Sequence, residues 1–102
     1  MVTIGRYNFE GPYASTSSLQ DRAGVYAILD DRNGTSYVID VVESATVKSR
    51  IENGHERENC WTKNRIGTLK VAVLYTPGSQ QAGRMQIEQE LREQYSPVCG
   101  VR

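Results

Sequence analysis

Two charged residues, Asp40 and Arg50, have neighbours in the sequence that indicate a chemical role for them. Asp40 interrupts an otherwise apolar run, residues 37–42, which reads as a strand buried on both faces. An unpaired carboxylate there would cost several kcal/mol, so Asp40 requires a cationic or metal partner, or a raised pKa. Arg50 follows in a short helical pattern, three residues after Val47, at the border of its apolar stripe. It can therefore reach back over the preceding strands.

A glutamate and the single histidine complete this set. Glu88 is one position after Ile87 and three before Leu91, so it can point into a groove between a helix and a sheet. Arg84, four residues earlier, offers the alternative of a surface salt bridge. His55 titrates near neutral pH, which suits both a site and an ordinary structural role. A carboxylate, an arginine and a histidine could together bind a cation and an anionic substrate.

The elements that position these residues are an antiparallel hairpin and two helices. Residues 25–29 and 36–42 are rich in β-branched and aromatic types, and Asn33-Gly34 between them favours a tight turn at Arg32–Gly34. The sequence predicts an α+β fold in which a small three-stranded antiparallel sheet is flanked by helices. The expected strands lie near 24–30, 35–43 and 68–76, and the expected helices near 45–53 and 80–95.

The remaining segments are assigned by their composition. Residues 1–22 alternate aromatic and polar side chains, which fits a short strand or a strap on a core formed by residues 23–100. Residues 55–65 fit a short helix or an ordered loop that places Trp61 in the core. Ser44 and Ser79 are candidate N-caps for the two longer helices. A chain of 102 residues predicts a single domain.

Bulk properties restrict the function classes. Twelve Lys and Arg balance twelve Asp and Glu, so the overall charge gives no drive toward nucleic acid. Residues 48–70 nevertheless carry an excess of positive charge. No apolar run is long enough to span a bilayer and no signal segment opens the chain, which predicts a cytoplasmic protein that does not contact membranes. Cys60 and Cys99 lack zinc-site spacing, and free thiols are expected.

Three motifs resemble the GIY-YIG nuclease superfamily. Gly24-Val25-Tyr26 is similar to the Gly-Ile-Tyr strand, and Arg50 stands where the family has a helix arginine. Glu88, followed by Pro97, is similar to the family's metal-binding glutamate. The resemblance covers roughly residues 22–100 and implies a GIY-YIG-like fold.

The sequence departs from the family at its second motif. Counting back from Arg50 puts Asp40-Val41-Val42 where Tyr-Ile-Gly belongs, and Tyr37-Val38-Ile39 is a rival alignment that needs a longer connection. Both alignments lack the glycine. Gly100 also stands where the family has an asparagine.

The resemblance implies a role for each matching residue. Glu88 would hold one divalent ion. The expected ion is Mg²⁺, because it prefers oxygen ligands and is bound by few protein groups. Arg50 would contact the scissile phosphate, and Tyr26 would position or deprotonate the water. His55 falls where many family members carry a histidine near the site. Asp40 could be an extra metal ligand, a base, or the buried partner of Arg50.

Three functions follow. The first is a small Mg²⁺-dependent endonuclease acting on DNA phosphodiesters, with a low rate because of the altered second motif. The second is an inactive GIY-YIG-like domain that binds nucleic acid or a protein partner through the same groove. The third is an interaction domain in which the motif is a coincidence. The sequence does not specify an oligomeric state.

Overall fold

The computed structural model describes residues 1–78 and 80–100. The chain forms five strands, three α-helices and one 3-10 turn within these residues. Their bounds are β1 (Val2–Ile4), β2 (Tyr7–Tyr13), a 3-10 turn η1 (Thr16–Ser18), β3 (Gly24–Arg32), β4 (Thr35–Ser44), α1 (Val47–Glu52), α2 (Glu58–Asn64), β5 (Thr68–Tyr75) and α3 (Gln81–Tyr95). The predicted α+β class is confirmed.

The sheet has five strands in the order β1-β2-β5-β3-β4, and every neighbouring pair is antiparallel. The prediction of three strands was therefore wrong. The predicted strands exist as β3, β4 and β5, but β4 was expected to be a central strand and lies at the edge of the sheet. The N-terminal segment adds β2 beside β5 and β1 beside β2. Residues 1–22 were hard to assign because their aromatic and polar residues alternate over only a few positions.

The predicted hairpin turn is confirmed. Arg32 pairs with Thr35, and Asn33 and Gly34 between them have φ angles of 54° and 87°. Asn and Gly tolerate these positive values, which match the twist of the flanking strands. Further along, Ile28 pairs with Asp40 whereas Leu29 pairs with Val38, so β4 has one extra residue at this point.

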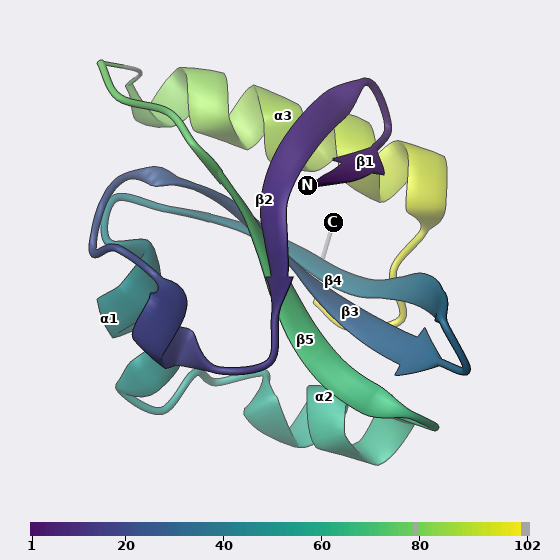
Figure 1. Cartoon of the computed structure of the whole chain (residues 1–102). Helices are drawn as coiled ribbons and strands as arrows, with labels where there is room; N and C mark the ends of the chain where they lie inside the picture. The colour runs from purple at the N-terminus through teal and green to yellow at the C-terminus, as the bar shows by residue number, and fades with distance from the viewer. Residues whose placement is uncertain (79, 101–102) are drawn as a thin grey trace.

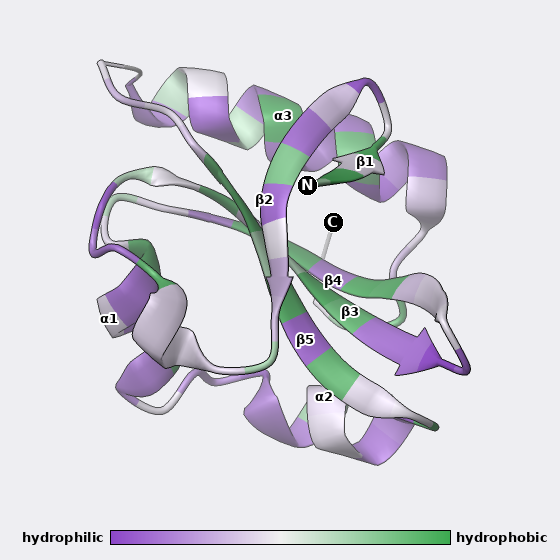
Figure 2. Ribbon diagram, in the orientation of Figure 1, coloured by the Kyte–Doolittle hydropathy of each residue, from purple (hydrophilic) through white to green (hydrophobic). Residues whose placement is uncertain are grey.

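Each face of the sheet has its own core. Helix α3 covers one face, and α1, α2 and η1 lie on the other (Figure 1). Tyr26, Val47 and Trp61 are buried in the core beneath α1 and α2, and Phe9 and Leu91 in the core beneath α3. Strand β3 is hydrophobic through its middle and turns hydrophilic toward its arrowhead, where it leaves both cores (Figure 2).

The short helices begin later than predicted. Thr46 is the N-cap of α1, and the Ser44 hydroxyl accepts a hydrogen bond from the Thr46 N–H at 3.0 Å. Ser44 therefore supports the turn before the helix and is not its cap. Ser79 lies outside the described residues, and Gln80 is the N-cap of α3. Helix α2 buries Trp61, as predicted.

A disulfide joins Cys60 of α2 to Cys99 near the C-terminus. The prediction of free thiols was wrong. The two cysteines are 39 residues apart in sequence, but the fold brings their Cα atoms to 5.9 Å. Cys99 reaches this position because its N–H donates to the Ile39 carbonyl of β4 at 3.0 Å. No sequence spacing reveals such a contact.

A buried charge cluster connects β4 to both helical layers. The Asp40 carboxylate is fully buried and accepts hydrogen bonds from Arg92 of α3 at 2.5 Å and from the Trp61 indole of α2 at 2.6 Å. Arg57 donates to it at 3.0 Å. Of the alternatives that the sequence left open for Asp40, a buried ion pair with Arg50 is not formed, because Arg50 binds Glu56 instead. Arg57 and Arg92 lie on segments that fold over β4 from two sides and supply the compensating charge.

Gly100 lies against this cluster. A side chain there would collide with the guanidinium groups of Arg57 and Arg92, and the φ of Gly100 is 93°. Both observations require glycine. The arginine pair on Asp40 therefore depends on glycine at this position. No helix within the described part of the chain is long and apolar enough to cross a membrane.

Replacing Asp40 by Ala should strongly destabilise the protein. The change leaves Arg57 and Arg92 without their shared carboxylate, and breaking a buried ion pair costs about 3–5 kcal/mol. Urea unfolding measures this loss. Glu93→Ala, which removes an exposed carboxylate of α3, is the control and should change the free energy of unfolding by less than about 0.5 kcal/mol. Equal small effects would show that the cluster does not stabilise the fold.

Reducing the Cys60–Cys99 bond should lower the free energy of unfolding by about 2–4 kcal/mol, because the unfolded chain loses a covalent loop. Thermal melts with and without a reductant measure the change. The Cys60→Ala/Cys99→Ala variant should melt at one temperature in both conditions. Thiol titration of the unreduced protein in denaturant would contradict the bond if both cysteines reacted.

Candidate functional site

Tyr26 lies near the start of β3 and is fully buried. It pairs with Val42 of β4 and Val73 of β5. Burial raises the pKa of its phenol strongly, and the nearby Arg50 charge only partly opposes this. The hydroxyl has no hydrogen-bond partner among the described residues. Tyr26 is therefore a neutral phenol with an unused donor, which suits positioning a substrate oxygen better than removing a proton.

His55 packs beside Tyr26 in the segment between α1 and α2. The two rings meet edge to face with their centroids 6.0 Å apart, and the centroid of the Trp61 ring lies 4.5 Å from that of His55. The Arg57 N–H donates to Nδ1 of His55 at 3.1 Å. Burial lowers the pKa of His55, and the charges of Arg50 and Arg57 lower it further. The ring is therefore neutral near pH 7, with its proton assigned to Nε2.

Nε2 of His55 is also buried and has no partner among the described residues. Two unpaired buried groups on neighbouring rings, the Tyr26 hydroxyl and His55 Nε2, are unusual, because buried polar atoms are nearly always hydrogen-bonded. Each of these two atoms is a donor that a bound oxygen would satisfy.

Arg50 lies at the exposed side of these rings. Its two terminal nitrogens donate to the two carboxylate oxygens of Glu56 at 2.7 and 2.6 Å. The Arg50 side chain is 37% exposed and that of Glu56 58% exposed. The Arg50 guanidinium holds the pKa of Glu56 at about 2, so the pair is fully charged at neutral pH. The fork geometry of Arg50 is that of an oxyanion site.

Glu88 lies at the outer edge of β4. Its Oε1 accepts a hydrogen bond from the Glu43 N–H at 2.8 Å, and its Oε2 lies 3.9 Å from Nε of Arg92. The sequence offered a salt bridge between Glu88 and Arg84. In the structure Glu88 pairs instead with Arg92, four residues later. Arg84 pairs with the Glu43 carboxylate at 3.0 Å.

The donor set at Glu88 fits a sparse divalent-cation site. One hydrogen bond leaves lone pairs free on a carboxylate that is 23% exposed. Mg²⁺ commonly binds one or two carboxylates and completes its shell with water and substrate phosphate. Glu43 is the second carboxylate at this edge. No group of three acidic, histidine or cysteine side chains able to hold a metal occurs within residues 1–78 and 80–100.

The structure brings Tyr26, Arg50 and His55 together, and the Asp40 charge also acts on Tyr26 and His55. The Asp40 carboxylate itself is buried and accepts hydrogen bonds from two arginines and an indole. Tyr37, the alternative from the rival alignment, is 45% exposed and pairs with Asp30, well along the hairpin from Tyr26.

Sequence reasoning missed Glu56 and the arginines of the Asp40 cluster. Arg92 had one signal, its i,i+4 spacing from Glu88. Glu56 and Arg57 lie in a loop, where no periodicity indicates direction. Their roles depend on how that loop folds back over β4.

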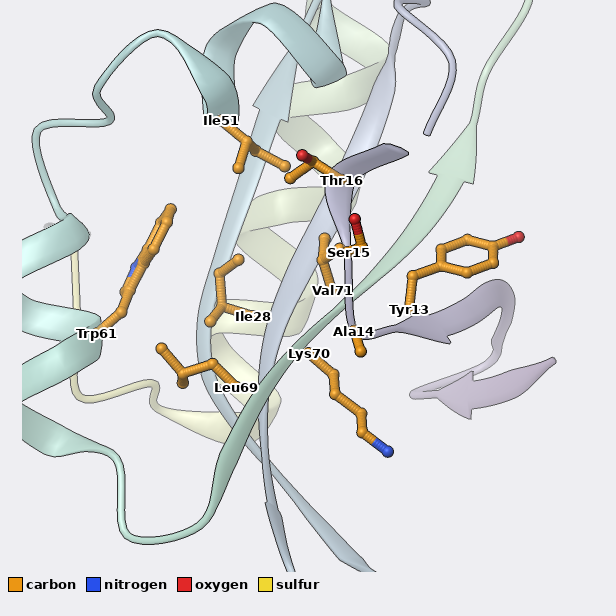
Figure 3. A pocket seen from close by; sticks show the side chains of 10 residues that line it. All are labelled: Tyr13, Ala14, Ser15, Thr16, Ile28, Ile51, Trp61, Leu69, Lys70 and Val71. Carbon is orange, nitrogen blue, oxygen red and sulfur yellow. The ribbon is translucent and has the colours of Figure 1, made fainter. Parts of the chain in front are cut away.

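A small pocket lies on the same face of the sheet as Tyr26. It has a volume of about 140 Å³ and is mostly apolar. Trp61 and Ile51 form one wall, Ile28 and Leu69 lie on the sheet opposite them, and the Lys70 ammonium points away from Trp61 (Figure 3). Trp61 therefore separates this pocket from His55.

The sequence matches no protein-family model and no curated protein. Solved structures do match the fold. Two are the GIY-YIG N-terminal endonuclease domain of UvrC from Thermotoga maritima, as two different tyrosine-to-phenylalanine point mutants, each bound to its catalytic divalent cation. Both have a TM-score of 0.58. Each match covers 85% of this chain and 91% of the UvrC domain, at sequence identities of 14% and 13%. The chain therefore has a GIY-YIG-like fold.

Proposed function

We propose that this protein is a weak GIY-YIG-like endonuclease that cleaves phosphodiester bonds of DNA or another nucleic acid with the help of a divalent cation. One observation carries the proposal: the unpaired buried groups of Tyr26 and His55 lie beside the arginine fork of Arg50. Hydrogen-bond donors and a cation around one position are what a phosphate in its transition state needs.

Each side chain has a defined task in this proposal. Arg50 binds two oxygens of the scissile phosphate in place of Glu56 and neutralises charge as it develops. The Tyr26 hydroxyl and Nε2–H of His55 donate hydrogen bonds and hold the phosphate or the attacking water. Glu88 holds the divalent cation, with Glu43 as its neighbour. When bound, the cation supplies Lewis acidity that neutralises phosphate charge.

The rate should be low because the second motif has no hydroxyl to offer. In the alignment counted back from Arg50, Asp40 takes the place of the second tyrosine, and its carboxylate is used by Arg57, Arg92 and Trp61. This same observation favours a second candidate function, an inactive domain that binds nucleic acid or a protein through the same surface. The two functions differ in their dependence on Glu88.

With Mg²⁺ or Mn²⁺ present, purified protein should nick supercoiled or branched DNA, and a chelator should stop the nicking. Arg50→Ala and Glu88→Gln should each lower the rate about 10²–10³-fold, because each removes charge stabilisation at the phosphate. Glu88→Gln keeps the acceptor for the Glu43 N–H, so the fold is preserved. Long incubations and gel analysis measure the rates.

The control is Glu93→Gln, the same charge change at an exposed position of α3. It should cut at the wild-type rate. If wild type and Glu88→Gln show the same background cutting, and Mg²⁺ leaves the NMR signals around Glu88 unmoved, the nuclease proposal fails. Binding by the inactive domain is then the better function.

The neutral state of His55 makes stability depend on pH. The pKa of His55 is lowered in the folded protein. Below about pH 6.5 the unfolded chain therefore binds a proton that the folded chain does not yet bind. The free energy of unfolding should therefore fall as the pH is lowered from 7 toward the folded pKa, by at most about 1.4 kcal/mol per pH unit. Urea unfolding at several pH values measures the slope.

His55 is the only histidine, so His55→Gln should flatten this slope between about pH 6.5 and 5.5. Carboxylate titration affects both proteins equally and serves as the internal reference at lower pH. An unchanged slope in the variant would show that His55 is exposed and charged, and its assignment as a neutral donor would be withdrawn.

A further inference from the structure

The Arg50–Glu56 pair closes the candidate site from the solvent side. Both terminal nitrogens of Arg50 are used by Glu56, at 2.7 and 2.6 Å. The same carboxylate lies 3.7 Å from Nδ1 of His55, and its negative charge helps to raise the pKa of Tyr26. Glu56 therefore holds the position that a substrate oxyanion would take if Arg50 contacted it.

We propose that Glu56 is a specificity-determining residue whose carboxylate occupies the oxyanion site on Arg50, so that only an anion with two adjacent oxygens, such as phosphate or a phosphodiester, displaces it. This inference rests on the proposed function, because it assigns the substrate's phosphate to Arg50. It adds that access to Arg50 is a competition between two oxyanions.

The chemistry of the pair supports selection rather than permanent blockage. A carboxylate and a phosphate both present paired oxygens that match the guanidinium fork, whereas chloride presents a single charge. Glu56 is more than half exposed, so its side chain can leave into water. Exposed ion pairs contribute little to stability, so an anion of better geometry can replace the carboxylate.

The position of Glu56 in the chain also allows this movement. It lies in the short segment between α1 and α2, after Gly54, whose φ is 77°. The next residue, Arg57, is fixed by its bond to Asp40, and His55 is buried. The backbone on both sides is therefore held, and release of the Glu56 side chain requires only that its bonds to Arg50 and to its own N–H be broken.

The test compares Glu56→Gln with Glu58→Gln. Glu58 is exposed at the start of α2, and its removal changes the net charge equally. Titration with inorganic phosphate at constant ionic strength is followed by the NMR signal of the Arg50 side chain. Glu56→Gln should bind phosphate, and a labelled short DNA, about twofold to fivefold more tightly than wild type, as expected for loss of an exposed competing pair.

Glu58→Gln should bind both probes as wild type does, and chloride should not move the Arg50 signal. In an Arg50→Ala background, where binding of the labelled DNA is the readout, Glu56→Gln should have no effect, since a double-mutant cycle isolates the pair. Equal gains in Glu56→Gln and Glu58→Gln would reduce the effect to general charge and overturn the inference. So would a gain that persists without Arg50, or the absence of any phosphate response at Arg50.

The outcomes separate this inference from the proposed function. If Glu56 competes with phosphate as expected but no DNA is cut with any divalent cation, the nuclease proposal fails and the competition at Arg50 stands. If DNA is cut in a Glu88-dependent way but Glu56→Gln behaves as Glu58→Gln, the nuclease proposal stands and Glu56 is an ordinary surface partner.

Discussion

The buried carboxylate of Asp40 is the constraint around which the two helical layers are arranged. Taking this charge out of water is tolerable only because Arg57, Arg92 and the Trp61 indole all reach it. These groups come from opposite sides of the sheet, so satisfying one carboxylate fixes α2 and α3 relative to β4. Arg92 also lies 3.9 Å from Glu88, which links the position of that glutamate to the same cluster.

This arrangement gives Asp40 a structural role. Its carboxylate is buried and bound by two arginines, so it is withdrawn from solvent. Gly100 and the disulfide at Cys99 complete the seal, because the glycine leaves room for the guanidinium groups and the Cys99 carbonyl accepts a hydrogen bond from Arg92 at 3.1 Å. The candidate site is left with Tyr26, His55 and Arg50 on its α1 side.

The sequence predicted well whatever depends on local pattern. Asn33-Gly34 located the hairpin turn, and the apolar run around Asp40 indicated that its carboxylate is buried. The partners of Asp40 could not be predicted, because Arg57 and Arg92 are 17 and 52 residues away and many arginines compete for the assignment. The same limit hid the pairing of Cys60 with Cys99. Tyr26, Arg50 and Glu88 were found through the family motif, while the contact between Arg50 and Glu56 depends on a loop.

Strand β4 is an edge strand, and its free edge is already occupied along the site. The Glu43 N–H is taken by Glu88, the Val41 carbonyl by Arg92, and the Ile39 carbonyl by the Cys99 N–H. Unpaired edge groups of this kind are where another chain adds a strand and aggregation begins. The side chains and C-terminal segment that surround the candidate site therefore also protect the protein from self-association through β4.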